Sequence, residues 1–381
     1  MRDKNSIMGN RLHLTESIRN YMVEHVLSTF GNLGGDVRME EKSAEFLGNY
    51  DFNVHHISRV RGAYVLATDK GTKLLKEYGG TEKRAFSEQK VMQHIKAEGM
   101  PLVDCYVPNK EGNLITKDEY GMSYVIKDWF LGEECNIKRQ EKCLLAVHNL
   151  AKLHNCLTDL ELTEEECAQM AQKNLKEVFQ KRNRELKRVY SYIKERRQKC
   201  YFEVYYLNTF SAFYEEALKA EELLGKISYE SCYKAAKKTQ VCHGNYTHHN
   251  ILLLPDGKVA TTNFDRMETG IQMSDFYLFF RKVMEKTDWN AAVAEAMLAS
   301  YQKERSVLEE EWAVLYLLLL YPEKFWKITN CYYNSKKTWI PEKNTEKLIT
   351  VKEQIEKKQQ VLQEIILPHF SETKKRPAFS I

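Results

Sequence analysis

The stretch VCHGNYTHHNILLLPDGKVATTNFDR, residues 241–266, carries the most distinctive pattern in this chain. It opens with His243-Gly244, reaches Asn250 just before an apolar run, turns at Asp256-Gly257 and closes on Asn263-Phe264-Asp265. The apolar run and the β-branched run after the Asp-Gly turn predict two short antiparallel strands. Polar side chains therefore stand at both ends of a small predicted hairpin.

Upstream of this hairpin the pattern is that of a small sheet. Residues 54–78 hold three strand-like runs, HHISRVRG, AYVLAT and TKLLKEY, and a DKG turn joins the last two. Two further runs, NLITKDE and MSYVIKDWF, flank a turn near Tyr120-Gly121. Between these groups, residues 81–96 place apolar side chains at helical spacing in a charged background, which predicts one helix.

Long helices dominate after Gly132. The segment CLLAVHNLAKLHNC places its apolar residues on one stripe, and Thr163 with Glu166 forms a capping box for the next helix. Residues 343–366 repeat apolar side chains in a near-heptad that favours a packed helix, since a coiled-coil dimer would need more heptads. The predicted fold class is α+β, with a small β-rich lobe, a short hinge and a large helical lobe that carries the hairpin.

We expect three regions along the chain. They are an N-terminal helical extension at residues 1–48, a small β-rich N-lobe at residues 49–130 and a large helical C-lobe at residues 131–381. The extension is predicted from apolar residues at helical spacing after Leu14, which end at the stretch GNLGGD. The last residues, ETKKRPAFSI, are expected to form a loose tail.

The composition excludes several classes of protein. With 381 residues, 43% hydrophobic and 29% charged, the chain is long enough for a well-buried core and typical of globular proteins. Nine cysteines without a C-x-x-C pair argue against a disulfide framework and indicate reduced thiols in an intracellular protein. No signal peptide is visible, and the longest apolar run, residues 312–321, is too short to span a bilayer. A net charge of +4 is too small to demand a nucleic-acid partner.

Basic residues crowd into one segment, residues 176–199. Glu177, Glu185 and Glu195 are interleaved with them, which favours a solvated helix face whose charges partly cancel. The alternative is a docking surface for an acidic partner, and the sequence leaves this alternative open.

The stretch at residues 241–266 resembles the catalytic segment of the kinase-like aminoglycoside phosphotransferase and choline kinase families. Those families usually read H-G-D-x-x-x-x-N, then a hairpin, then I-D-F or I-D-W. The resemblance implies a bilobal protein kinase-like fold. It also implies that the first aspartate accepts the proton of the substrate hydroxyl, while the asparagine and the second aspartate hold the metal that bridges the nucleotide phosphates.

Two positions depart from that pattern. Asn250 matches the family's asparagine, but Asn245 stands at the catalytic aspartate and Asn263 stands at the metal-binding aspartate. An amide has no useful basicity near neutral pH, and magnesium prefers anionic oxygens to neutral ones. Asp265, two residues on, is a candidate displaced metal ligand, although the alternation of a strand would put it on the same face as Asn263. The candidate metal ligands are therefore Asn250, Asn263 and Asp265.

The same resemblance assigns nucleotide-binding residues to the N-lobe. Lys76 stands where these kinases place the phosphate-pairing lysine, although it could equally be a strand-end lysine in solvent. Glu88 is its expected partner, with Glu82 as the alternative on the same helix. Backbone groups of Asp128-Trp129-Phe130 would meet an adenine. Only Gly62 occupies the region of the glycine-rich phosphate cover, so ATP is expected to bind weakly, and a need for magnesium is left open.

Two further residues match the families outside the loop. His154, in LAKLHN, resembles a helix histidine that is as readily a core residue as a functional one. Asp275 matches an aspartate near a helix start that usually braces the catalytic loop by hydrogen bonding.

Within this superfamily the chain is most similar to the CotS-type spore-coat proteins of spore-forming bacteria. The likeness is carried in order by GAYVLATDKGTKLLKEY, EKRAFSEQKVMQHIKAEGMP, WFLGEE, CHGNYTHHNILL, TNFDR, FFRKVMEK and YPEKFWKITNCYYNSKKTW. The resemblance implies a protein made in the cytoplasm of the sporulating mother cell and then deposited in the spore coat. Its implied partners are other coat proteins, with a nucleotide as a further candidate ligand.

Three functions remain to be compared. A pseudokinase with a structural or assembly role in the coat accounts for both amides, because phosphoryl transfer needs metal binding and hydroxyl orientation together. An active ATP-dependent kinase would phosphorylate an amino-sugar, a choline-like compound or an amino-alcohol, since this chemistry depends more on positioning than on a strong base. A helical scaffold that binds neither nucleotide nor metal is the third. The charge at residues 245 and 263 separates the first two.

Overall fold

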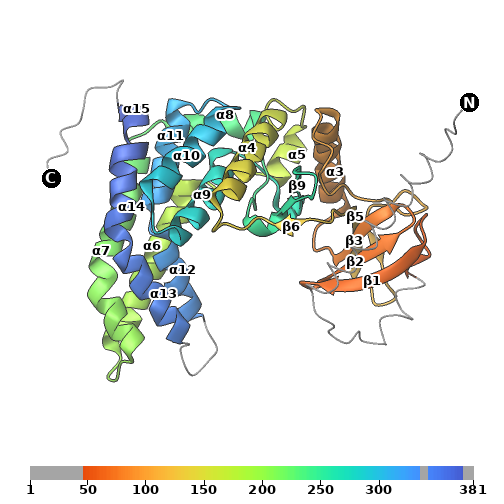
Figure 1. Ribbon diagram of the computed structural model, residues 1–381. Helices are drawn as coiled ribbons and strands as arrows, with labels where there is room; N and C mark the ends of the chain where they lie inside the picture. Colours follow the sequence, from red (N-terminus) through yellow and green to blue (C-terminus); the bar gives the residue numbers. More distant parts are fainter. Residues whose placement is uncertain (1–45, 335–341, 372–381) are drawn as a thin grey trace, which may run out of the picture. The chain divides into compact units, whose positions relative to one another are not determined.

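The computed structural model describes residues 46–334 and 342–371 (Figure 1). The chain forms two compact units, one running to Gly80 and resuming at Tyr106–Trp129, the other formed by Thr81–Cys105 and Phe130–Ile381. Most of the expected N-terminal extension, residues 1–45, and the expected tail, residues 372–381, lie outside the described residues. The lobe boundaries at residues 49–130 and 131–381 stay a prediction.

The smaller unit is built on an antiparallel five-stranded sheet of order β1-β2-β3-β5-β4. Its strands are β1 (Val54–Val60), β2 (Ala63–Thr68), β3 (Gly71–Glu77), β4 (Thr116–Lys117) and β5 (Ser123–Asp128). The turn between β1 and β2 uses positive φ angles at Arg61 and Gly62, 48° and 82°, as two-residue hairpin turns require. The predicted DKG turn joins β2 to β3 as expected.

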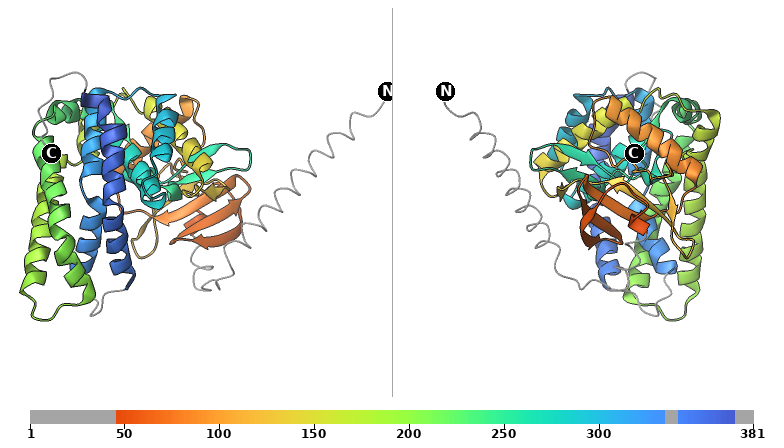
Figure 2. Two further views of the ribbon diagram at one scale, coloured as in Figure 1. Left: turned by 60° about the vertical axis from the view of Figure 1, so that its left-hand side comes forward. Right: turned by 90° about the vertical axis from the view of Figure 1, so that its right-hand side faces the viewer.

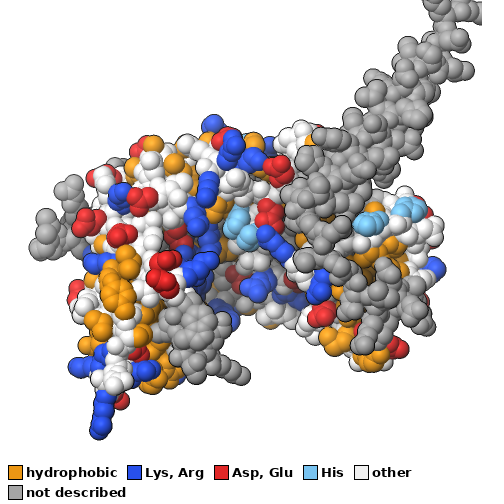
Figure 3. Space-filling view, turned by 60° about the horizontal axis from the view of Figure 1, so that its bottom comes forward, with side chains coloured by type: hydrophobic (Ala, Val, Ile, Leu, Met, Phe, Trp, Pro, Cys, Tyr) orange, Lys and Arg blue, Asp and Glu red, His pale blue; other side chains and the backbone are white. Residues whose placement is uncertain are grey.

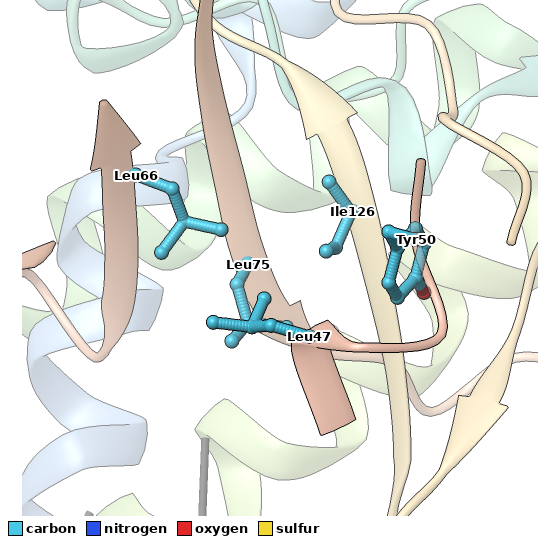
Figure 4. Packing of buried hydrophobic residues seen from close by; sticks show 5 residues of the cluster. All are labelled: Leu47, Tyr50, Leu66, Leu75 and Ile126. Atoms are coloured by element: carbon cyan, nitrogen blue, oxygen red, sulfur yellow. The ribbon is translucent and has the colours of Figure 1, made fainter. Parts of the chain in front are cut away.

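One face of this sheet packs into a small hydrophobic core, shown in Figure 4. Five side chains form it, namely Leu47, Tyr50, Leu66, Leu75 and Ile126. The Tyr50 hydroxyl also hydrogen-bonds the Thr116 hydroxyl at 2.8 Å, so burial leaves its polar atom satisfied. Each of these side chains contributes about 2 kcal/mol by leaving water, which makes the sheet a stable platform.

The larger unit is mainly helical, and its helices follow the capping signals in the sequence. Thr81 caps the first of them by accepting a hydrogen bond from the Arg84 backbone, and Thr163 with Glu166 forms the predicted capping box. The helices are α3 (Glu82–Ala97), α4 (Gln140–Cys156), α5 (Glu164–Gln169), α6 (Leu175–Glu195), α7 (Tyr201–Leu224), α8 (Tyr229–Thr239), α9 (Met273–Lys286), α10 (Ala291–Gln302), α11 (Glu309–Leu320), α12 (Glu323–Tyr333), α13 (Glu342–Glu353), α14 (Ile355–Val361) and α15 (Pro368–Ser371).

The predicted hairpin lies inside this helical unit. Strands β8 (Ile251–Leu253) and β9 (Val259–Thr261) pair antiparallel, and β6 (Glu133–Glu134) adds to β8. A second small ladder pairs β7 (Val241–Cys242) with β10 (Glu268–Thr269). The β7–β10 ladder therefore joins the two ends of the segment around residues 241–266, and β8 and β9 form the hairpin within it.

Long helices pack beside this part of the unit, and Figure 2 shows α6 and α7 running side by side. Aromatic rings join α7 to α12, since Phe325 stacks on Tyr206 with centroids 5.3 Å apart and on Phe213 with centroids 4.4 Å apart. The tail seam at residues 343–366 packs as helix, as expected, but it breaks at Gln354 and ends in a π-helical turn at Leu362–Ile366. Among the described residues, no helix is both long and apolar enough to cross a membrane.

Candidate functional site

A buried carboxylate anchors the backbone at the start of the loop. Asp275, in the first turn of α9, accepts hydrogen bonds from the backbone N–H of His243 at 2.6 Å and of Gly244 at 2.9 Å. Its side chain is almost wholly buried. Hydrogen bonds from two N–H groups to one carboxylate are strong, and they set the direction in which the loop leaves β7.

Behind Asp275 lies a buried histidine. His154 Nε2 is 3.5 Å from Asp275 Oδ2, and His154 Nδ1 is 2.6 Å from the Tyr301 hydroxyl. Burial lowers the pKa of His154, and this effect outweighs the opposing attraction of the Asp275 carboxylate. The imidazole is therefore neutral at physiological pH, and His154 is a core residue that supports Asp275.

Gly244 occupies a place that no other residue can take without strain. Its φ is +72°, and a Cβ atom there would lie 1.8 Å from the Arg266 carbonyl oxygen. The left-handed conformation and the close backbone approach both require glycine. The His-Gly pair of the sequence is therefore explained by contact between the two ends of the hairpin.

The ring of His243 connects the two ends. Its Nδ1 accepts a hydrogen bond from the Asn245 N–H at 3.1 Å, and its Nε2 donates to the Thr262 carbonyl at 3.0 Å. The ring also packs against Phe264, with centroids 4.5 Å apart. One neutral tautomer satisfies both contacts, so His243 holds Asn245 beside the segment that carries Asn263.

The asparagines of the loop are joined by hydrogen bonds to one another. Asn250 Nδ2 donates to the Asn245 carbonyl at 2.8 Å, and Asn263 Nδ2 donates to Asn250 Oδ1 at 2.9 Å. Asn250 thus uses both ends of its amide inside the loop. The structure brings together all three asparagines predicted from the sequence, and it directs an N–H group at the oxygen that a metal would need.

Asn263 adopts a left-handed backbone conformation, with φ 64° and ψ 55°. Asparagine tolerates this region better than most residues. Its backbone N–H donates to Asp104 Oδ2 at 2.8 Å, and Asp104 is wholly buried. A parallel bridge between Val103 and Thr261 places the segments of Asp104 and Asn263 side by side.

Asp104 was not predicted from the sequence. The only signal was an acidic residue within the apolar run PLVDCYV. Buried carboxylates are rare unless they are hydrogen-bonded or paired, so such a residue can be flagged as special, although its partner cannot be identified. The structure thus places the carboxylate of Asp104 at the backbone N–H of Asn263, whose own side chain is an amide.

Asp265 does not lie in a strand with Asn263, so the expected strand geometry was wrong. Strand β9 ends at Thr261, and residues Phe264–Arg266 form a 3₁₀ turn, so strand alternation does not relate Asp265 to Asn263. Asp265 is half-buried in that turn. Its role as a displaced ligand stays a prediction.

The donor set fits magnesium poorly. The two side chains at the expected metal position, Asn250 and Asn263, are neutral, and the Oδ1 of Asn250 already accepts a hydrogen bond. Among the residues that the structure describes, no group of three or more His, Cys, Asp and Glu side chains could hold a metal ion.

The predicted nucleotide-binding residues of the sheet unit lie on β3 and at the end of β5. Lys76 is half-buried on β3 opposite Val125, whereas Lys73, three residues earlier, forms the ion pair with Asp128 at 2.8 Å. The Trp129 N–H donates to the Thr72 carbonyl at 3.0 Å. Asp128 and Trp129 therefore already make contacts inside the sheet unit, and Phe130 is the first residue of the second part of the helical unit.

A second lysine shares the sheet face of Lys76. Lys127 is opposite Leu74 in the register of β3 and β5, and it is wholly buried with its ammonium 4.3 Å from the centre of the Tyr106 ring. Alternation along β3 puts Leu74 and Lys76 on one face. That face therefore carries Lys127 as well as Lys76, and only Lys76 was identified from the sequence.

Glu88 lies on α3 in the helical unit and is wholly buried. Arg84 Nε donates to Glu88 Oε1 at 2.6 Å, and the Arg84 guanidinium also donates to the Met267 carbonyl. The i,i+4 spacing of Arg84 and Glu88 was the available signal for this ion pair, and it was missed. The pairing of Glu88 with Lys76 stays a prediction.

Glu268 gives this region a pH-dependent stability. Burial raises its pKa from 4.5 to about 7, and the nearby Asp275 adds to the shift. Because the folded protein binds this proton more tightly than the unfolded chain does, the stability that it contributes is present at low pH and lost as pH rises through 7. In thermal melts, the wild-type melting temperature should fall between about pH 5 and about pH 8 more steeply than that of Glu268→Gln. Equal slopes for the two proteins would contradict this assignment.

Comparison with known proteins places this chain in a family. The family model described as Spore coat putative kinase YutH matches residues 44–365. Spore coat protein S of Bacillus subtilis (strain 168) is 22% identical over 316 residues, which cover 80% of this chain and 88% of that protein. The CotS-type resemblance read from the sequence is thereby confirmed.

Solved structures show the same fold at low sequence identity. An aminoglycoside phosphotransferase from Alicyclobacillus acidocaldarius superposes with a TM-score of 0.75 at 17% identity, covering 85% of this chain and 95% of that one. Spectinomycin phosphotransferase, solved with ADP and spectinomycin, gives a TM-score of 0.61 at 11% identity, covering 84% and 98%. The predicted kinase-like fold, with a small antiparallel sheet lobe and a helical lobe, is confirmed. Because the family model spans most of the chain, this protein belongs to the spore-coat putative kinases described as YutH.

Proposed function

We propose that this spore-coat kinase-like protein is a pseudokinase with a structural or assembly role in the coat. The observation that carries the proposal is the hydrogen bond from Asn263 Nδ2 to Asn250 Oδ1 at 2.9 Å. In an active phosphotransferase both side chains would present oxygen atoms to a metal ion. Here one amide satisfies the other, so the loop holds its shape without a cation.

A nucleotide remains a candidate ligand in this proposal. Spectinomycin phosphotransferase, which shares the fold, was solved with ADP. Lys76 and Glu88 are the residues that we propose for the phosphate side, and Asp128-Trp129-Phe130 for the adenine side. Without a carboxylate at residue 263, a metal ion adds little to the affinity of the protein for a nucleotide, whereas a lysine can still pair with phosphate.

The proposal predicts weak ATP binding that is nearly independent of magnesium. Calorimetric titration of the full chain with ATP should give dissociation constants that agree within about threefold with magnesium and with chelator. Affinity that rises about tenfold on adding magnesium, or about 1.4 kcal/mol, would contradict the pseudokinase proposal.

A second function is favoured by one observation at Asn245. Among the described residues, its half-buried side-chain amide makes no hydrogen bond, so it is available to orient a hydroxyl. An active small-molecule kinase for an amino-sugar, choline-like or amino-alcohol substrate would use Asn245 in this way. Steady ADP formation from ATP by the wild type, with transfer of the phosphoryl group to such an alcohol, would favour this function over the first.

The likeness to Spore coat protein S supports the proposed setting. We propose that the protein is made in the cytoplasm of the mother cell and joins the spore coat, with other coat proteins as partners. A role in assembly needs a surface for such partners.

A further inference from the structure

The basic segment of the chain forms the outer face of α6 and the turn that follows it. Seven exposed cations lie along it, namely Lys181, Arg184, Lys187, Arg188, Lys194, Arg196 and Arg197. The apolar face of the same helix, with Leu186, Val189 and Ile193, is buried in the helical unit. We call these seven side chains the basic face of α6.

Two carboxylates near this face, Glu185 and Glu203, are turned toward the protein, whereas Glu195 is exposed among the cations. Glu185 accepts a hydrogen bond from Trp326 Nε1 at 2.8 Å, whereas its distance to the Lys181 ammonium is longer, at 4.0 Å. Glu203 is almost wholly buried, where it contacts Arg196 at 3.2 Å and also accepts from the Tyr332 hydroxyl. Of the glutamates interleaved in the sequence, Glu185 therefore cancels less of the basic charge than its spacing indicates.

Exposed tyrosines border the basic face at the free end of the α6–α7 hairpin. Tyr201 is 67% exposed, and Tyr192 and Tyr333 are partly exposed with their rings packed edge to face at 5.6 Å. The Arg196 guanidinium donates to the Tyr192 hydroxyl at 3.3 Å. In Figure 3, Lys and Arg side chains gather at the lower left, where this hairpin ends, beside hydrophobic side chains.

We propose that the basic face of α6, with Tyr192 and Tyr201 at its end, is a docking surface for an acidic segment of another protein. Seven exposed cations outnumber the one glutamate exposed among them, Glu195, so the face complements a run of Asp and Glu side chains. From Lys181 to Lys194, within α6, the face is about 20 Å long at 1.5 Å per residue, which suits a short extended segment.

The geometry favours a protein over the two other anionic partners. A membrane-bound helix would insert its apolar face, but the apolar face of α6 is occupied by the core. A single-stranded nucleic acid would stack its bases on a series of open aromatic rings, whereas Tyr192 packs edge to face against Tyr333 and, of the bordering tyrosines, Tyr201 alone is mostly exposed. Tyrosine hydroxyls and guanidinium groups are well suited to bind carboxylates.

The test uses the full chain and a fluorescein-labelled polyglutamate peptide. The patch variant Lys187→Gln/Arg188→Gln/Lys194→Gln removes three exposed cations of the basic face, and Lys234→Gln/Lys238→Gln/Lys286→Gln removes three exposed cations from α8 and α9. Fluorescence anisotropy should show salt-sensitive binding to the wild type, weakened about tenfold in the patch variant and less than about twofold in the control. Circular dichroism checks that all three proteins are folded.

Three results would overturn the proposal. Equal losses in the patch and control variants would mean that only net charge matters, and unchanged binding by the patch variant would exclude this face. Tighter binding of short single-stranded DNA, or of phosphatidylglycerol vesicles, than of the peptide at the same salt concentration would assign the face to another partner. None of these results depends on whether the loop is catalytic, so the test is independent of the proposed function.

Discussion

Replacing Asn245 and Asn263 together by aspartate should make ATP binding at least about tenfold tighter with magnesium than without it, a difference of about 1.4 kcal/mol. Each substitution exchanges an amide for a carboxylate of nearly the same volume. An aspartate at position 263 would offer an anionic oxygen where Asn263 now donates to Asn250 Oδ1. The double variant should gain more than the sum of the singles, because metal binding and hydroxyl orientation act as a unit.

The same variant should be less stable than the wild type when no metal is present. The substitution at position 263 would remove the hydrogen bond to Asn250 and place a carboxylate close to Asp104, whose Oδ2 accepts from the backbone of residue 263. An unsatisfied acceptor and a like charge each destabilise the folded state by about 1–2 kcal/mol. Melting temperatures of the wild type, both singles and the double, with magnesium and with chelator, measure this effect alongside the calorimetry.

A matched control separates the site from the added charge. Asn136→Asp/Asn290→Asp adds two carboxylates at positions where an asparagine oxygen already accepts a backbone N–H, so these changes should be tolerated. This control should show no magnesium dependence. If wild-type turnover is robust and the double substitution abolishes it, Asn245 and Asn263 are working parts of an enzyme and the pseudokinase proposal fails.

Gly244→Ala should lower the free energy of unfolding of the helical unit by about 3–5 kcal/mol, by combining a left-handed residue with a steric clash. The new Cβ atom would meet the Arg266 carbonyl oxygen at 1.8 Å, so the loop must move. Movement there would weaken the hydrogen bonds from His243 and Gly244 to Asp275. Scanning calorimetry should show a large fall in melting temperature.

Gly62→Ala is the control for this substitution. Its φ of +82° is as unfavourable for alanine, but a Cβ atom there has nothing within 4 Å. Its effect should be about 1–2 kcal/mol, the cost of the left-handed backbone alone. If both alanine variants lose the same stability, the close approach to Arg266 does not matter and the loop is more adaptable than described.

The sequence was sufficient for the fold because its signals are local. The DKG turn, the capping box at Thr163 and Glu166, and the Asp-Gly turn between β8 and β9 each depend on a few neighbouring residues. The positions of Asn245, Asn250 and Asn263 could be read for the same reason.

The contacts of the site could not be predicted because they join distant segments. Asp104 contacts a residue 159 positions away, and nothing in the run PLVDCYV identifies that partner. The interpretation of residues 263–265 as a strand was wrong because Asn263 turns into the left-handed region and starts a 3₁₀ turn. The direction of the Asn263 side chain depends on that turn. The hydrogen bond between Asn263 and Asn250 therefore could not be predicted from the sequence either.

The carboxylate of Asp275 has a consequence for the order in which the chain assembles during synthesis. The backbone N–H groups that donate to it lie 31 and 32 residues nearer the N-terminus, and the histidine behind it comes from α4. Until α9 has left the ribosome and packed, His243 and Gly244 lack the acceptor that fixes their direction. The loop therefore becomes ordered late, after the helices that precede it are already made, and a nascent chain that stops short of α9 presents no preformed loop to a ligand.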